Sequence, residues 1–336
     1  MEQFRNLPLG IQTFERLITE KNIYVDKSRY VYELAKTYSP YFLSRPRRFG
    51  KSLFLSTLRA YFEGRKDLFA GLELEELEPK LAKMQNRAPW IQHPILYLDF
   101  NTGDYSSLEA FRATIEKKLI EWESLYGLPE TNYRFTLADR FADVIKAASE
   151  KTGQKTVVLV DEYDKPLLNV VNNMELLDSF RMLLKSFYGV LKGNDRYLRF
   201  AFLTGVTRFD KVSIFSDLNN LFDISMSNEF AAICGYTQKE LERNFAPEIE
   251  ALAVAEGITK DECLAKLKEM YDGYVFSSKP QNVYNPFSAM SAFKNCEFGN
   301  YWFETGTPTF LVDRLRTISF DVRKFTDGTL YKGVCE

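Results

Sequence analysis

Two segments of this chain hold the side chains best suited to chemistry. The first, residues 45–52, reads Arg-Pro-Arg-Arg-Phe-Gly-Lys-Ser. Backbone N–H groups at the mouth of a helix, the ammonium of Lys51 and a serine hydroxyl are the groups that hold nucleotide phosphates and their Mg²⁺. The second is an apolar run, residues 156–160, that ends in Asp161 and Glu162. A buried strand that delivers two carboxylates supplies a metal anchor and a base for water. Together the segments predict a nucleotide phosphate site.

The first segment departs from the general phosphate-loop pattern at Arg45. Glycine usually stands five positions before the second glycine, which is Gly50 here. A side chain narrows the permitted backbone angles, so the standard loop path is in doubt at Arg45. The Gly-Lys-Ser sequence is intact, and the flanking arginines add positive charge beside the expected phosphates. We expect the nucleotide to contact a run of consecutive residues: Arg47, Arg48, Phe49, Gly50, Lys51, Ser52 and Leu53.

The carboxylates of the second segment have separate expected roles. Asp161 would hold Mg²⁺ through water, with the hydroxyl of Ser52 as the other protein ligand, and Glu162 would orient or deprotonate the attacking water. Asp164 and Lys165 follow closely. They either bind neighbouring groups of the site or simply solvate the end of the strand.

A third segment follows the apolar run at residues 198–203. In P-loop enzymes with an additional strand, this strand lies between the two motif strands, so its tip points at the γ-phosphate. Thr204 is the expected sensor there, and Arg208 is expected to stabilise transition-state charge, with a surface salt bridge as its alternative. The catalytic set predicted from sequence is Lys51, Glu162, Thr204 and Arg208.

Short apolar runs alternate with helical patterns along the chain, which is typical of α/β proteins. The runs are nearly continuous, as expected for parallel strands covered on both faces. We therefore predict a three-layer α/β/α fold around a parallel sheet. The expected strands are residues 41–43, 95–100, 156–160, 198–203 and 221–224, and the expected helices include residues 53–62, 108–125 and 176–191.

Beyond about residue 226 the strand pattern fades. Thr237-x-x-Glu240 and Thr259-x-x-Glu262 are capping boxes, and Asn285-Pro286 and Thr307-Pro308 each place a cap and an N1 proline at the start of a helix. These signals predict a mostly helical appendage, either a lid or a winged-helix-like unit. The predicted domains are residues 1–230, with the phosphate site, and residues 231–336, the appendage.

Composition excludes several classes of protein. The formal net charge of −2 gives no support to a chain-wide nucleic-acid surface, because nonspecific affinity for polyanions comes from excess Lys and Arg. The four cysteines are dispersed and are expected to be reduced, and His93, the single histidine, is expected to serve in a loop. No apolar stretch is long enough to span a membrane and the polar start is no signal peptide, so a cytoplasmic location is expected.

The combined motifs resemble the AAA-ATPase-like family of bacterial proteins. The resemblance implies an AAA-like P-loop ATPase domain of the additional-strand type, ATP and Mg²⁺ as ligands, and the Arg-Pro-Arg-Arg-Phe-Gly-Lys loop as a family feature. It also implies a following PD-(D/E)xK nuclease-like domain, before which this chain is expected to be truncated. The segments that carry the resemblance are residues 10–11, 24–28, 43–52, 161–164, 204–208, 284–288 and 300–308.

Three functional hypotheses follow from these residues. The first is a Mg²⁺-dependent ATPase. The second is a nucleotide-gated switch or interaction module with little hydrolysis, and the third is a DNA-associated protein whose ATPase regulates a nuclease-like domain. We expect the aromatic residues 301–303 to pack at the junction between the appendage and the core, in preference to stacking on nucleic-acid bases. Tyr24 and Asp26 are expected near the base, and the oligomeric state is left open, a homo-oligomer included.

Overall fold

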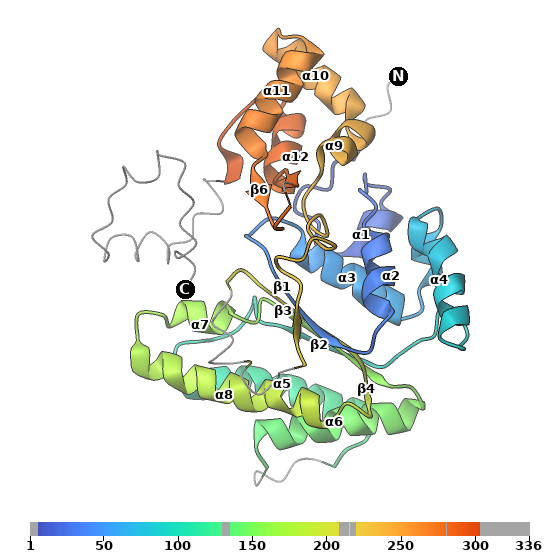
Figure 1. Ribbon diagram of the computed structural model, residues 1–336. Coiled ribbons are helices and arrows are strands. Elements are labelled where there is room, and N and C mark those ends of the chain that lie inside the picture. Colours follow the sequence, from blue (N-terminus) through green and yellow to red (C-terminus); the bar gives the residue numbers. More distant parts are fainter. Residues whose placement is uncertain (1–5, 130–134, 208–214, 216–219, 280, 303–336) are drawn as a thin grey trace.

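A five-stranded parallel sheet forms the centre of the chain in a computed structural model that describes residues 6–129, 135–207, 215, 220–279 and 281–302. Its order is β2-β3-β4-β1-β5, and every pairing is parallel. All carboxyl ends of the strands therefore meet at one edge of the sheet. Figure 1 shows β1 to β4 at the centre of the chain, with helices around them. The strands are β1 (Pro40–Ser44), β2 (Ile95–Asp99), β3 (Thr156–Asp161), β4 (Leu198–Gly205) and β5 (Phe222–Asp223).

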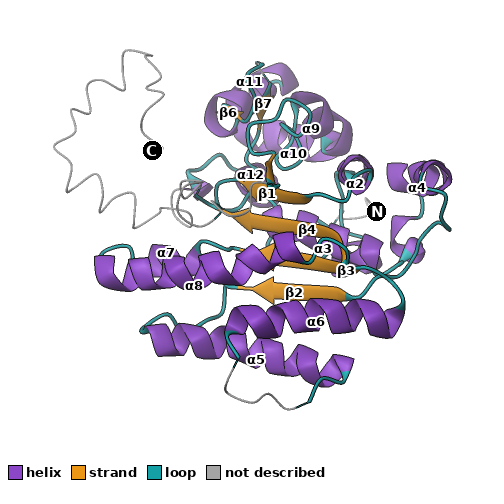
Figure 2. Cartoon of the chain, turned by 60° about the horizontal axis from the view of Figure 1, so that its bottom comes forward, coloured by secondary structure: helices purple, strands orange, loops and turns teal. Residues whose placement is uncertain are grey.

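Helices cover both faces of this sheet, which gives three layers (Figure 2). Alternate strand residues enter separate cores: Phe42 and Val160 pack with the group α5, α6 and α8, whereas Leu43 and Val157 pack with the group α1 to α4. The helices are α1 (Phe14–Thr19), α2 (Ser28–Ala35), α3 (Lys51–Phe62), α4 (Glu73–Met84), α5 (Leu108–Tyr126), α6 (Leu137–Thr152), α7 (Lys165–Asn169) and α8 (Met174–Gly193), with a 3-10 turn η1 (Lys66–Phe69).

The C-terminal appendage combines helices with a small antiparallel hairpin. Capping boxes at Thr237 and Thr259 begin α9 and α11, and the Asn285 side chain accepts a hydrogen bond from Ser288 N at the start of α12. These three predicted helix starts are confirmed. The elements are α9 (Gln238–Asn244), α10 (Ala246–Glu256), α11 (Lys260–Tyr271), β6 (Tyr274–Val275), β7 (Asn282–Val283) and α12 (Pro286–Asn295). The helix start expected at Thr307 lies outside the described residues.

The strand order confirms the predicted fold class. As expected, β4 lies between β1 and β3, the two strands that carry the sequence motifs. Each predicted strand coincides with an observed one, with small shifts at the ends; the shortest is β5. The division at residue 230 stays a prediction. Phe230, Ile233 and Cys234 belong to the same hydrophobic core as Leu43 and Leu55, so the packing is continuous across that position.

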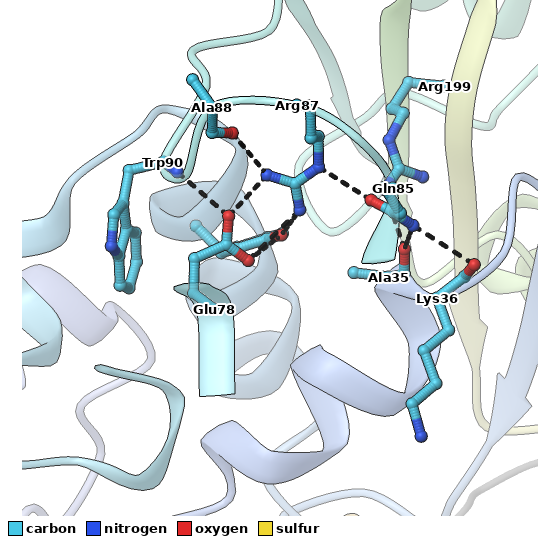
Figure 3. A network of polar contacts seen from close by, with 9 residues as sticks. Ala35, Lys36, Glu78, Gln85, Arg87, Ala88, Trp90 and Arg199 are labelled. Carbon is cyan, nitrogen blue, oxygen red and sulfur yellow. Dashed lines mark hydrogen bonds and ion pairs between the residues drawn. The ribbon is translucent and has the colours of Figure 1, made fainter. Parts of the chain in front are cut away.

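A buried polar network fixes the connection between α4 and β2, at a distance along the chain from the two motifs (Figure 3). The carboxylate of Glu78 is fully buried and accepts from Arg87 Nη1 at 2.6 Å, Tyr61 Oη at 2.8 Å and the backbone N–H of Trp90 at 3.0 Å. Burial, and secondly the charge of Glu78, raises the pKa of Tyr61 well above its usual value, so the phenol remains a donor. The network stabilises Trp90 in a left-handed backbone conformation, with φ 57°.

Replacing Glu78 with leucine should lower the free energy of unfolding by about 3 to 5 kcal/mol, because the substitution leaves the largely buried guanidinium of Arg87 without its carboxylate partner. Urea denaturation followed by circular dichroism would measure the change. Glu76→Leu, at an exposed position of the same helix, is the matched control and should stay within about 0.5 kcal/mol of wild type. A similar small change for Glu78→Leu would show that the network contributes little to stability.

The remaining composition-based expectations concern single residues. His93 lies in a loop before β2, where its Nδ1 is 2.8 Å from the carbonyl oxygen of Lys155, and burial lowers its pKa to about 4. Cys234, Cys263 and Cys296 are free thiols. In the part of the chain that the structure describes, none of the helices combines the length and the hydrophobicity required to cross a lipid bilayer.

Candidate nucleotide site

The sheet brings the two motifs together at its carboxyl edge. Ser44, the last residue of β1, is in register with Gly205, and Leu43 is in register with Thr204. On the other side of β4, Val160 is in register with Leu203. Because β4 separates β1 from β3, the loop after β1 and the carboxylates after β3 lie on either side of Thr204. The strand arrangement expected from the sequence is present.

The candidate phosphate loop, residues 45–50, reaches α3 through a left-handed residue. Gly50 is the N-cap of α3 with φ 93°, a conformation that strains a residue carrying a Cβ. Arg48 is also left-handed, at φ 69°, whereas Arg45 is not among the positive-φ residues. Arg45 therefore needs no glycine-like backbone. The doubt about the loop path at this position is resolved by the observed backbone.

The side chain of Arg45 binds the start of the loop to the segment that follows β5. It is 1 % exposed, and its Nη atoms donate to the carbonyl oxygens of Ser225 at 2.7 Å and Phe230 at 3.0 Å. Its guanidinium also lies 4.0 Å from the ring centroid of Phe276. Burial lowers the pKa of Arg45 to about 10, so the group is still charged at neutral pH. The arginine in place of the usual glycine thus binds the loop to the segment after β5.

Lys51 lies against Glu162 across the site. Its Nζ is 3.2 Å from Glu162 Oε1 and 3.4 Å from the carbonyl oxygen of Pro46, and the two charged side chains are only 3 % and 14 % exposed. Glu162 is left-handed at φ 52°, a conformation that is uncommon for a residue with a side chain and is found at functional sites. The turn aims the carboxylate across the sheet edge toward the phosphate loop.

The hydroxyl of Thr204 joins the two carboxylate residues of the second motif. Thr204 Oγ1 donates to Asp161 Oδ1 at 2.6 Å and accepts from the backbone N–H of Glu162 at 3.3 Å. Burial raises the pKa of Asp161, and hydrogen bonds from Ser52 and Thr204 oppose that shift. Thr204 therefore fixes the orientation of both residues. The expected role of Thr204 as a sensor of the γ-phosphate stays a prediction.

The side chain of Asp164 joins the turn that follows these carboxylates to the segment after β4. Its Oδ2 accepts from Thr207 N at 2.6 Å, from the Thr207 hydroxyl at 2.6 Å and from Val206 N at 3.0 Å. Burial, and secondly the charge of Glu162, raises the pKa of Asp164 to about 6. A Cβ at Gly205 would lie 2.8 Å from Asp164 Oδ1 and 2.5 Å from the Tyr163 ring, so glycine is required for this close approach. Asp164 has a structural role in the turn.

A cavity of about 390 Å³ opens beside these groups, a volume suited to a small-molecule ligand. Its lining includes Lys51, Ser52, Leu53 and Glu162, together with residues of the N-terminal segment and of the appendage. The remaining loop residues of the predicted nucleotide-contact set, Arg47, Arg48, Phe49 and Gly50, also line it.

Of the two residues expected near the base, only Tyr24 lines this cavity. Asp26 instead accepts hydrogen bonds from Ser28 N and Glu73 N, both at 2.8 Å, and so joins the starts of α2 and α4. Asp99 accepts from Asn101 N at 2.8 Å and stabilises the loop after β2. Asn101 and Lys165 line the cavity, but sequence reasoning gave neither a defined role in the site.

Aromatic side chains of the appendage contact the phosphate loop. The ring centroid of Phe49 lies 4.6 Å from that of Tyr274, and the guanidinium of Arg48 lies 4.6 Å from the ring centroid of Phe287. Trp302 Nε1 donates to the carbonyl oxygen of Arg47 at 3.2 Å. Because the Phe49 ring is buried among these aromatic residues, contact with a nucleotide would come from its backbone.

The aromatic residues 301–303 can be placed in part. Tyr301 packs against the helical appendage and Trp302 contacts the phosphate loop, as expected for packing at the junction. Phe303 lies outside the described residues, as does Arg208, the expected source of transition-state charge. The proposed roles of Arg208 and of the other site residues therefore stay predictions.

The residues present fit Mg²⁺ of the kind that accompanies nucleotide phosphates. Within the described residues, no three or more His, Cys, Asp or Glu side chains gather to hold a metal ion. Mg²⁺ at phosphate sites instead uses one or two carboxylates, with the phosphates and water completing its shell. The hydroxyl of Ser52 and the carboxylate of Asp161 supply that donor set, and Ser52 is close enough to oppose the rise in the pKa of Asp161.

The strand order, the left-handed glycine before α3 and the Lys51–Glu162 pair define a P-loop type of α/β protein. A family model described as a predicted AAA-ATPase matches residues 8–215, and the chain belongs to this AAA-ATPase-like family. It is also similar to an "Uncharacterized protein in vnfD 5′region" of Azotobacter chroococcum mcd 1, with 41 % identity over 313 residues. That match covers 93 % of this chain and 56 % of the relative, so the chain spans little more than half of the relative's length.

Proposed function

We propose that this protein binds ATP with Mg²⁺ and hydrolyses it. The observation that carries the proposal is the placement of Lys51 Nζ 3.2 Å from Glu162 Oε1 on the wall of one cavity. A cation for the phosphates and a carboxylate for water are thereby held at the same point. Membership in a family of predicted AAA-ATPases supports the same assignment.

The proposed roles follow from the contacts of each side chain. Lys51 would move from Glu162 to the β- and γ-phosphates, and backbone N–H groups of the loop would bind the phosphate oxygens. The carboxylate released by this movement would orient a water molecule and accept its proton. Ser52 and Asp161 would hold Mg²⁺, which offsets phosphate charge when bound. Thr204 keeps Asp161 and the Glu162 backbone in position.

Release of inorganic phosphate from ATP by the purified wild-type chain tests the proposal. We expect Mg²⁺-dependent turnover that EDTA abolishes, and we expect calorimetry to show binding of MgATP. Parallel assays with and without DNA would separate an autonomous ATPase from the DNA-associated alternative. A folded protein that binds no adenine nucleotide would contradict the proposal.

A second candidate, a nucleotide-gated switch, is favoured by the contacts between the appendage and the phosphate loop. A ligand that orders Arg47 and Arg48 would also act on Trp302 and Phe287, which touch them. In that case wild type would bind MgATP with almost no turnover, and hydrogen exchange across residues 284–302 would slow on binding. Rapid hydrolysis with unchanged exchange there would exclude the switch.

A further inference from the structure

The turn after Glu162 returns the chain to the wall of the cavity at Lys165. The backbone N–H of Lys165 donates to the carbonyl oxygen of Glu162 at 3.0 Å, which closes a tight four-residue turn. Within this turn, Tyr163 N donates to the carbonyl oxygen of Thr204 at 2.8 Å, and Asp164 accepts three hydrogen bonds from Val206 and Thr207. The backbone of Lys165 is therefore fixed relative to Glu162.

Lys165 and Glu162 line the same cavity, together with Asn101 from the loop after β2. In the described parts of the chain, the Lys165 ammonium forms no ion pair or side-chain hydrogen bond, and the residue is half-buried. Lys27, another lysine that lines the cavity, differs because its Nζ is bound to Glu240 Oε1 at 2.6 Å and to the carbonyl oxygen of Ala232 at 2.8 Å. Lys165 thus has a fixed backbone and an ammonium that is not committed to a protein partner.

The position of Glu162 indicates which part of a nucleotide would lie beside Lys165. A water that Glu162 activates must lie within hydrogen-bond reach of its carboxylate and next to the γ-phosphorus. In hydrolysis, the water oxygen bonds to phosphorus while the bond to the β–γ bridging oxygen breaks, its electron pair stays on ADP, and the water proton passes to Glu162. Negative charge is spread over the γ-phosphoryl oxygens in that step. A cation that lines the same cavity as Glu162 could stabilise this charge.

We infer that Lys165 is a further catalytic residue, which binds the γ-phosphoryl group from the side of the attacking water, opposite the phosphate loop. The inference rests on the proposed ATPase function. The cation is the ammonium of Lys165, which follows the second motif and is distinct from the charged groups of Lys51 and Arg208. Lys165 would discriminate ATP from ADP, because ADP lacks the group that it contacts.

Lys165→Met tests the inference by two readouts. A single charge-stabilising contact in a transition state typically contributes about 100-fold, so turnover should fall by about that factor. Affinity for MgATP should fall by about 10-fold, as expected for the loss of one charge-assisted contact, whereas affinity for MgADP should stay within about 2-fold. Lys165→Arg should recover much of the ATP preference. Lys192→Met, at an exposed site in the last turn of α8, is the matched control.

The affinity ratio separates the possible outcomes. An unchanged ATP-to-ADP ratio, or an equal loss of both ligands, would overturn the role of Lys165, and thermal melting would show whether the variant is folded. If wild type binds ATP without hydrolysing it, the ATPase proposal fails, and the ratio still decides whether Lys165 contacts the γ-phosphate. If wild type binds neither nucleotide, both proposals are wrong.

Discussion

Replacing Glu162 with glutamine is expected to lower the rate of ATP hydrolysis by about 100-fold or more, because general-base catalysis commonly contributes that much. Glutamine keeps the shape of the side chain but cannot take the proton of water. Affinity for MgATP should be retained or should rise, since Lys51 no longer has to leave a carboxylate 3.2 Å away before it contacts phosphate. Single-turnover phosphate release and calorimetric titration would measure the two effects separately.

The matched control is Glu150→Gln, which removes an exposed carboxylate from α6 and should leave turnover unchanged. Equal steady-state rates for wild type and Glu162→Gln would contradict the role of Glu162 in activating water. They would favour the switch hypothesis if binding of MgATP persisted. Loss of both binding and folding would instead show that the Glu162 side chain is needed to form the turn.

Replacing Lys51 with alanine is expected to weaken MgATP binding by about 30- to 150-fold. One charge-assisted contact to phosphate in a partly desolvated site contributes on the order of 2 to 3 kcal/mol, which corresponds to this change in affinity. The substitution also leaves the carboxylate of Glu162 unpaired at the phosphate position, and its repulsion adds to the loss. Isothermal titration calorimetry with MgATP is the measurement.

Two controls keep this result interpretable. Lys80→Ala, at an exposed position of α4, removes the same charge from the chain and should not change affinity. The double variant Lys51→Ala, Glu162→Gln should recover part of the lost affinity, because it also removes the repelling carboxylate. Unchanged MgATP affinity in folded Lys51→Ala would overturn the assignment of the loop as the phosphate site.

Much of the fold was predictable from sequence because its strands are continuous apolar runs. Parallel strands buried on both faces require such runs, and the motif at Asp161 identified the strand beside β4. The pairing of Thr204 with Asp161 was not specified by spacing. It depends on the lateral order of the strands, which the P-loop class implies. In the structure, Thr204 Oγ1 lies 2.6 Å from Asp161 Oδ1.

The contacts across the site could not be predicted in the same way. Arg45 and Ser225 are brought together by a pairing of β1 with the short β5, and no local pattern signals that contact. The position of Lys165 at the cavity depends on a turn that Asp164 holds against Thr207, and a sequence pattern does not distinguish a solvated lysine from one that lines a cavity. Long-range contacts of this kind follow from tertiary packing.

The attachment of the phosphate loop to the appendage sets the size of the smallest unit that can be expected to bind nucleotide. The family match ends at residue 215, but the groups that hold the loop from outside are Ser225, Phe230, Tyr274, Phe287 and Trp302. A fragment cut at the end of the match would keep Lys51 and Glu162 and lose every one of these supports. Its phosphate loop would have the right sequence without the restraints that shape it. For this protein, the boundary of family similarity and the boundary of the binding unit are therefore different positions in the chain.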